Sequence, residues 1–135
     1  MRRIRATSLG AAAALVLALA GCGQSAHDAV QSKVQQFVQA TAAHDYRTLC
    51  TEVLGPALLA RLRAGGVPCE QAMSIALGRV HAPILSVGRI TVDGDRAQAI
   101  TLSGAAGQRG AFETIGLVNT SNGWRISSLA TPSVR

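Results

Sequence analysis

The spacing of hydrophobic residues changes near Pro83. Before this residue, apolar side chains recur every three or four positions, which is the spacing of an amphipathic α-helix. After it, β-branched and other apolar residues tend to alternate with polar ones, which is the spacing of a half-buried β-strand. The pattern therefore predicts a helical first part of the chain followed by a sheet.

Four helices are expected in the first part. The first lies within residues 26–45, where glutamines occupy most of the face opposite the apolar residues. Its apolar face carries Val30, Val34, Phe37, Val38 and Thr41. The other three are expected at residues 46–54, 56–64 and 69–80. Asp45 is expected to cap the second helix, and Pro56 suits the first turn of the third.

Four strands are expected at residues 84–92, 95–102, 111–119 and 124–130. The alternation shifts phase at Gly88–Arg89, which predicts a β-bulge, and Asp93–Gly94 is typical of a two-residue hairpin. Helices followed by antiparallel strands indicate a single α+β domain, residues 26–130, in which the N-terminal helices pack on a curved antiparallel sheet. Residues 131–135 are expected to form a loose tail.

The first 21 residues are typical of a bacterial signal peptide. Three arginines precede an uncharged apolar run at 9–20, which is shorter than the roughly 20 residues that a membrane-spanning helix needs. The run ends in Leu19-Ala20-Gly21-Cys22, which resembles the bacterial lipobox. The resemblance implies cleavage between Gly21 and Cys22 and attachment of lipid to the Cys22 thiol.

The mature protein is therefore expected to be a lipoprotein. Acyl chains such as palmitate on Cys22 would anchor it to the extracytoplasmic face of the bacterial cell membrane, with residues 22–25 as a short linker. The alternative is a chance cysteine after a short hydrophobic helix. Arg2-Arg3 also fits the twin-arginine export route, but the residues that usually surround that pair are missing, so general secretion is favoured.

The net charge of +6 suggests nucleic-acid binding, but its distribution does not. Removal of residues 1–21 takes away three of the 13 basic residues and none of the seven acidic ones, which leaves a charge of about +3. The remaining arginines are scattered, whereas binding to phosphates needs a clustered basic face. No nucleic-acid partner is predicted.

Two cysteines remain after lipidation of Cys22, and they lie outside the cytoplasm, where free thiols oxidise. Cys50 and Cys69 are therefore expected to form a disulfide that closes a loop of about 20 residues and contributes roughly 3 kcal/mol. A zinc site with His44 and His81 is the alternative, but the ligand spacing is not that of a known metal motif. A redox pair would need the spacing C-x-x-C, which is absent. No metal or cofactor is predicted.

The order of elements resembles a known fold. The segments that carry the resemblance are FVQATAAHDYRTLC (37–50), VDGDRA (92–97) and NGWRISSL (122–129). They resemble the cone-shaped fold of the nuclear transport factor 2 (NTF2)-like superfamily, which includes ketosteroid isomerase and polyketide cyclase-like proteins. More specifically, the chain resembles the small actinobacterial lipoproteins of that superfamily, in which a cysteine pair joins two helices. The usual early strand pair is not visible in residues 51–68.

The resemblance implies an apolar pocket inside the curved sheet. Aromatic residues expected to line it are Phe37, Tyr46, Phe112 and Trp124. Enzymes of this superfamily place an acid or base there, and Glu113 and His81 are the candidates. The favoured arrangement turns Phe112 inward and Glu113 outward, because neighbouring strand residues face opposite sides. The other register would make Glu113 a general base in an apolar cavity, whereas His81 is expected in a solvated loop.

Three functions are consistent with this sequence. The favoured one is a non-catalytic, lipid-anchored domain that binds a small apolar ligand or a partner protein at the cell surface. The alternative is an enzyme of the isomerase or cyclase type that uses Glu113 or His81. The third is a structural or accessory subunit that dimerises through the open face of the sheet, which would be favoured if residues such as Ile100, Leu102, Ile115 or Leu117 face outward.

Overall fold

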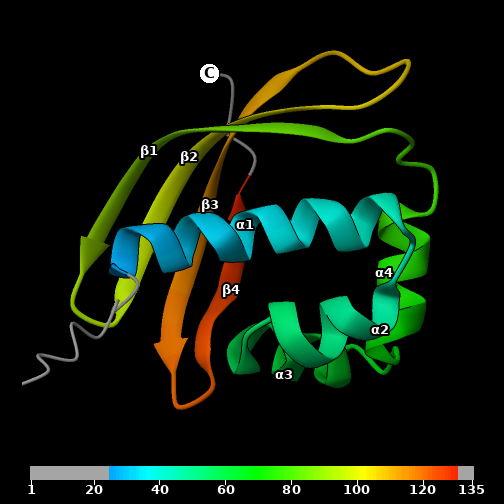
Figure 1. Ribbon diagram of the computed structural model, residues 1–135. Coiled ribbons are helices and arrows are strands. Elements are labelled where there is room, and N and C mark those ends of the chain that lie inside the picture. Colours follow the sequence, from blue (N-terminus) through cyan, green and yellow to red (C-terminus); the bar gives the residue numbers. More distant parts are fainter. Residues whose placement is uncertain (1–24, 131–135) are drawn as a thin grey trace, which may run out of the picture.

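The computed structural model describes residues 25–130 of the 135-residue chain. The predicted signal peptide, Cys22 and the predicted tail at 131–135 lie outside the described residues. Within the described range, the helices come first and pack on a four-stranded antiparallel sheet, as predicted (Figure 1). No helix in this range is both long and apolar enough to span a membrane.

The helical elements are α1 (Ala26–Ala42), α2 (Tyr46–Thr48), the π-helical turn η1 (Leu49–Val53), α3 (Pro56–Ala64) and α4 (Cys69–Leu77). The strands are β1 (Ile84–Asp93), β2 (Arg96–Gly104), β3 (Ala111–Thr120) and β4 (Gly123–Ala130). Helix α1 crosses the strands and contacts both β1 and β4, while α3 contacts β4.

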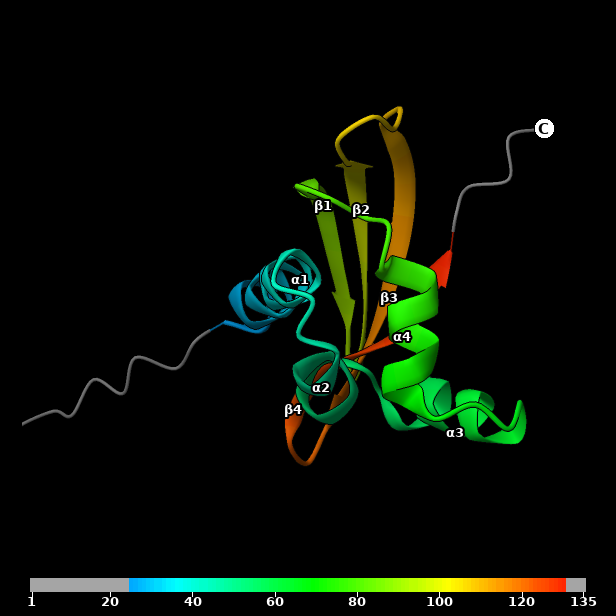
Figure 2. The same ribbon diagram turned by 90° about the vertical axis from the view of Figure 1, so that its right-hand side faces the viewer.

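The sheet is a meander in the order β1-β2-β3-β4 (Figure 2). The register between β1 and β2 shifts between Val87 and Arg89, which confirms the predicted bulge. The predicted hairpin is also present, and Gly94 adopts a φ of +58° that favours glycine. A second register shift interrupts the pairing of β3 with β4 between Gly116 and Leu117. Bulges increase the local twist of a sheet, and both lie in strands that border the helices.

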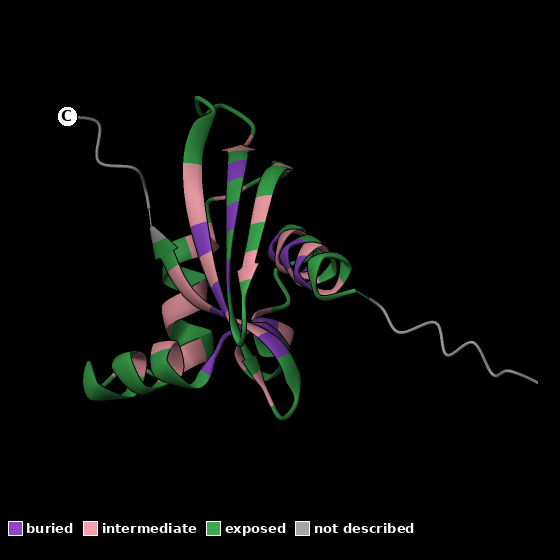
Figure 3. Ribbon diagram, turned by 90° about the vertical axis from the view of Figure 1, so that its left-hand side faces the viewer, coloured by how far each residue is buried: buried purple, intermediate pink, exposed green. Residues whose placement is uncertain are grey.

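The core lies between the helices and the face of the sheet that they cover. Its strand residues alternate with exposed ones, as the stripes along β2 in Figure 3 show. The buried strand side chains are Ala97, Ala99, Thr101, Ile115, Leu117, Trp124 and Ile126. Three of these are on β2 and are small, which allows α1 to pack close to the middle of the sheet.

The opposite face of the sheet exposes apolar side chains to solvent. Ile100, Leu102 and Phe112 are 43, 44 and 65% exposed. Leu102 and Phe112 lie opposite each other on β2 and β3, so these side chains form one patch, here called the outer-face patch. Ile115 and Leu117 face the core instead.

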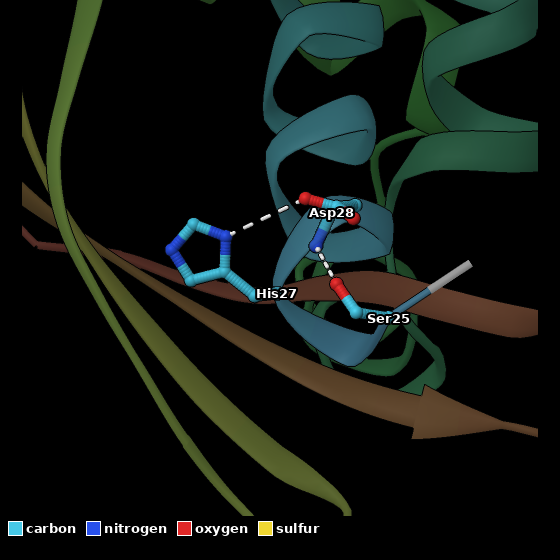
Figure 4. Close-up of polar contacts among 3 residues, drawn as sticks. All are labelled: Ser25, His27 and Asp28. Carbon is cyan, nitrogen blue, oxygen red and sulfur yellow. Dashed lines mark hydrogen bonds and ion pairs between the residues drawn. The ribbon is translucent and has the colours of Figure 1, made fainter. Parts of the chain in front are cut away.

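Helix α1 begins at a side-chain cap. The Ser25 hydroxyl accepts a hydrogen bond from the backbone N–H of Asp28 at 3.1 Å (Figure 4). The Asp28 carboxylate lies in the first turn, where the helix dipole favours negative charge, and it is 3.8 Å from His27 Nδ1. Val30 and Val34 are fully buried, which confirms the predicted apolar face.

The prediction of one regular α-helix at residues 46–54 is wrong, because this segment divides into α2 and η1. Asp45 caps it as expected, because its carboxylate accepts hydrogen bonds from the backbone N–H and the hydroxyl of Thr48. After one turn, however, the chain widens into η1, where the N–H of Leu54 donates to the carbonyl of Leu49. This wider turn buries Leu49 and Val53 on one side, so burial takes precedence over regular helix geometry.

Helix α3 begins at Pro56 as predicted, and the preceding N–H of Gly55 donates to the carbonyl of Ile126 on β4. Helix α4 ends at Leu77, three residues before the predicted end, and Gly78 caps it. The predicted disulfide joins Cys50 to Cys69 with 6.0 Å between their Cα atoms. It links η1 to the first turn of α4.

Candidate ligand-binding pocket

A pocket of about 300 Å³ opens between α1, the α4–β1 connection and one end of the sheet. Helix α1 contributes Phe37, Val38 and Thr41 from its C-terminal half. These residues follow the apolar face of the helix beyond the buried valines, so the helix surface continues from the core into the pocket. A volume of this size is at the lower end of the range for small-molecule sites.

Most of the remaining wall is aliphatic. Leu77, Val80 and Pro83 come from the end of α4 and its connection to β1, and Ile115 and Leu129 come from the sheet. Ile115 is only 1% exposed, whereas Leu129 is 47% exposed. The pocket therefore runs from the edge of the core out to the surface.

The β2–β3 loop forms part of the rim. The lining residues at this rim come from the end of β2 and from the loop, and they are Gly104, Ala105, Gln108 and Arg109. The backbone N–H of Ala106 donates to the carbonyl of His81 at 2.9 Å, which holds the loop against the α4–β1 connection. Two segments far apart in the sequence are thereby joined at the mouth.

Two hydroxyls and two charged groups of the pocket lining differ in their partners. The Thr41 hydroxyl donates to the carbonyl of Phe37 at 2.8 Å, and the Ser103 hydroxyl donates to the carbonyl of Ala111 at 3.4 Å. The carboxylate of Glu113 and the guanidinium of Arg109 have no hydrogen-bond or ion-pair partner among residues 25–130. These are the two charged groups of the lining, and both remain available to a ligand.

Comparison with known proteins identifies the fold. The sequence matches no protein-family model and no curated protein. Among solved structures, the Kfla4162 protein from Kribbella flavida matches with a TM-score of 0.58 and 19% identity over 81% of this chain and 90% of that chain. An NTF2-like protein of unknown function from Shewanella baltica OS155 has a TM-score of 0.56 and 11% identity, over 76% and 89%. A third, from Silicibacter pomeroyi DSS-3, is also NTF2-like and of unknown function, with a TM-score of 0.56 and 16% identity over 75% and 89%.

The chain has an NTF2-like fold. This likeness, at such low identity, concerns the fold alone. It agrees with the α+β architecture expected from the sequence. Residues 51–68 hold no strand pair and instead contain the end of η1, helix α3 and Leu54, which forms a single parallel bridge with Ile126.

The favoured orientation of Glu113 is wrong. Glu113 lies opposite the buried Thr101 and lines the pocket, while Phe112 points to the other face and is 65% exposed. The reason is the alternation along β3. Ile115 and Leu117 are both buried, and Glu113 shares their face of the strand. Phe112 therefore does not line the pocket.

Of the other three residues predicted to line the pocket, one does and two do not. Phe37 lines the pocket. Tyr46 does not, and instead is half-buried at the α1–α2 turn, where its hydroxyl lies 2.8 Å from His44 Nδ1. Trp124 is buried in the core near the β3–β4 turn and does not reach this pocket either.

His81 is exposed, as favoured from the sequence, and its side chain is absent from the pocket lining. Its ring centroid lies 6.0 Å from that of His44. The zinc alternative fails because Cys50 and Cys69 are joined in the disulfide. Among residues 25–130, no group of three or more His, Cys, Asp or Glu residues is placed to hold a metal ion.

A second depression lies beside Trp124 and Lys33. The Lys33 ammonium donates to Gln36 Oε1 at 2.7 Å and to the carbonyl of Glu52 at 3.0 Å. Burial lowers the pKa of Lys33, and the positive charge of Arg125 lowers it further, while Glu52 opposes them. Lys33 and Gln36 are thus held by each other and by Glu52, and the first pocket, with its larger aliphatic wall, is the better candidate for a ligand.

Sequence reasoning did not single out Arg109 or Leu129. Arg109 belongs to the glycine-rich segment 103–110, whose path is not encoded by any periodicity. Leu129 belongs to a predicted strand, but the register shift near Gly116 decides which way it faces. Neither residue carried a signal that could have placed it at a pocket.

Proposed function

We propose that the protein is a lipid-anchored extracytoplasmic domain that binds a small apolar molecule in the pocket between α1 and the sheet. The observation that carries this proposal is the pocket itself, about 300 Å³ with a mainly aliphatic wall that reaches the surface. At about 30 Å³ per non-hydrogen atom, the volume of a water molecule in the liquid, it holds about ten such atoms.

The anchor is supported by the sequence Leu19-Ala20-Gly21-Cys22 after a short apolar run. Four residues, 22–25, separate the expected lipid from α1, and an extended chain of that length spans at most about 14 Å. The domain would therefore stay next to the membrane surface. Intact-mass spectrometry of the membrane fraction tests this, since it should show a chain that begins at a lipid-modified Cys22. A chain that retains residues 1–21 would contradict it.

Ligand binding is tested by native mass spectrometry of the purified protein. We expect a co-purifying small molecule that is lost in Ala111→Trp, because Ala111 lines the pocket and an indole there would fill it. Thr91→Trp is the matched control, since Thr91 is an exposed residue near the end of β1 and does not line the pocket. Equal ligand occupancy in both variants would contradict binding in this pocket.

An enzyme of the isomerase or cyclase type is the second candidate. It is favoured by one observation, which is that Glu113 faces the pocket and has no partner among the described residues. A carboxylate in that position is within reach of a bound molecule and fits the role of a general base. Deuterium exchange into the co-purified molecule, present with the wild type and absent with Glu113→Gln, would support this candidate. Binding without exchange would favour the non-catalytic role.

Self-association is a further part of the proposal. The outer-face patch consists of Ile100, Leu102 and Phe112 on adjacent strands, and all three are large apolar side chains exposed to solvent. Contiguous exposed apolar surface of this kind is typical of interfaces. We infer that a second copy of the chain covers it, which would leave the pockets of both copies free on the opposite faces.

A further inference from the structure

Glu113 has an unusual position for a carboxylate. It is half-buried on β3, between Ala111 and Ile115 on the same face of the strand, and all three line the pocket. Its strand partner is Thr101, which is 1% exposed, and the Thr101 hydroxyl donates to the backbone carbonyl of Glu113 rather than to its carboxylate. The side chain therefore reaches into a mainly apolar space from a rigid, paired strand.

The described part of the chain offers the Glu113 carboxylate no partner. Among residues 25–130 it accepts no hydrogen bond and forms no ion pair. When no ligand is bound, water that enters from the open end can hydrate the carboxylate. A molecule that fills the pocket displaces this water, and burying a carboxylate without a replacement donor is unfavourable.

We propose that Glu113 makes the pocket selective for small apolar molecules that carry a hydrogen-bond donor, a hydroxyl or an amino group, on their skeleton. This inference rests on the proposed function, since it needs the pocket to bind a ligand. The selectivity comes mainly from weaker binding of molecules that lack a donor. A hydrocarbon of the same shape gains the same apolar contacts but leaves the carboxylate unpaired, while the donor replaces the lost water.

Arg109 acts at a different point of the site. It is exposed on the β2–β3 loop at the rim, where solvent screens its charge, whereas Glu113 is half-buried on the strand. An acidic group that entered beyond the rim would meet the like charge of Glu113. The geometry therefore places donor groups inside the pocket, and any hydrogen-bond acceptor of the ligand toward the mouth near Arg109.

Three probes of nearly equal shape separate these effects. Carvacrol has a phenolic hydroxyl, its methyl ether has the oxygen without a donor, and cymene has neither, and each is about the size that the pocket holds. With the purified protein, isothermal titration calorimetry should give a Kd for carvacrol about tenfold lower than for the ether or for cymene, as for a hydrogen bond to a charged group.

Variants assign the preference to Glu113. In Glu113→Leu the preference for carvacrol should disappear, and cymene should bind more tightly than to the wild type. Glu113→Gln, which keeps the shape, should lie between the two and tests the proposal even where the leucine variant folds poorly. Glu70→Gln is the control, because Glu70 is exposed on α4 and does not line the pocket, and it should leave all three constants unchanged.

The outcomes are distinct. Equal affinity of the wild type for all three probes would overturn the role of Glu113 but leave an apolar binding pocket. A preference for carvacrol that persists in Glu113→Leu would overturn it too. Failure of the wild type to bind any of the probes would instead overturn the proposed function, and the inference with it.

Discussion

Glu113 lies directly opposite Thr101 in the ladder between β2 and β3, and both face the helices. The Glu113 carboxylate therefore shares the inner face of the sheet with a buried threonine of the neighbouring strand. The pairing also explains why neighbouring Phe112, which is larger and apolar, points to solvent. Within a regular strand the face of one residue sets the face of all the others, so the polarity of a single side chain does not decide whether it is buried.

Ile115 is the aliphatic residue at which the core meets the pocket. Ile115→Ala should lower the free energy of unfolding by about 2–4 kcal/mol, because the side chain is 1% exposed and its removal leaves a cavity. Urea denaturation followed by circular dichroism measures the change. Ile75→Ala is the matched control, since Ile75 is 70% exposed on α4, and it should change stability by less than about 0.5 kcal/mol. Similar losses in both variants would contradict the described core.

The Cys50–Cys69 disulfide closes a loop with a sequence separation of 19 residues. Its reduction should destabilise the domain by about 3 kcal/mol, chiefly because the unfolded chain regains conformational freedom. Urea denaturation with and without dithiothreitol measures this difference. The double variant Cys50→Ser/Cys69→Ser should have the stability of the reduced wild type and should not respond to the reductant. Free thiols at both cysteines in the oxidised protein would refute the bond.

The Asp45 cap predicts a dependence of stability on pH. Hydrogen bonds from the backbone N–H of Thr48, and then from its hydroxyl, hold the pKa of Asp45 below its ordinary value of 3.8. The cap therefore stabilises the fold at pH values above the ordinary pKa, and this stabilisation is lost as the pH falls through the lowered one.

Asp45→Ala should accordingly lower the thermal midpoint at neutral pH, and the difference from the wild type should shrink as the solution is made strongly acidic. Thr48→Val removes the hydroxyl donor but keeps the backbone donor, so it should show a smaller difference with the same direction of pH dependence. Thermal scans from neutral to strongly acidic pH measure both. A difference that is constant across the range would contradict the lowered pKa.

The outer-face patch predicts concentration-dependent dimers. Leu102→Glu should convert them to monomers, because it places a charge in the middle of the apolar contact. Sedimentation velocity at several concentrations measures the change. Ile75→Glu makes the same kind of substitution at an exposed position on α4 and should leave the dimer intact. A wild type that stays monomeric at all concentrations would remove this part of the proposal.

Much of the fold follows from local chemistry. The apolar spacing from Val30 to Thr41 predicted α1, Gly88–Arg89 predicted the bulge, and Asp93–Gly94 predicted the hairpin, because each depends on residues close in sequence. The break of the second helix into η1 did not follow from local chemistry. Leu49 and Val53 leave regular helix geometry to reach a core formed by distant strands, and no local preference encodes that.

The candidate site was harder to predict than the fold. Phe37 could be placed because it continues the apolar face of α1. The orientation of Glu113 was predicted incorrectly from Phe112, although the pair Ile115 and Leu117, two and four residues further along, gives the correct face. Arg109 could not be placed, since the path of a glycine-rich loop depends on contacts such as the bond from Ala106 to His81.

The position of α3 within the closed covalent loop has a consequence for proteolysis. None of the residues of α3 is buried, and Arg61 and Arg63 are both exposed on it. A protease that cuts after either arginine would act on a segment whose two sides are joined by the Cys50–Cys69 bond. The nicked protein would stay in one piece until the disulfide is reduced, so a cut in α3 would not separate the N-terminal helix from the sheet.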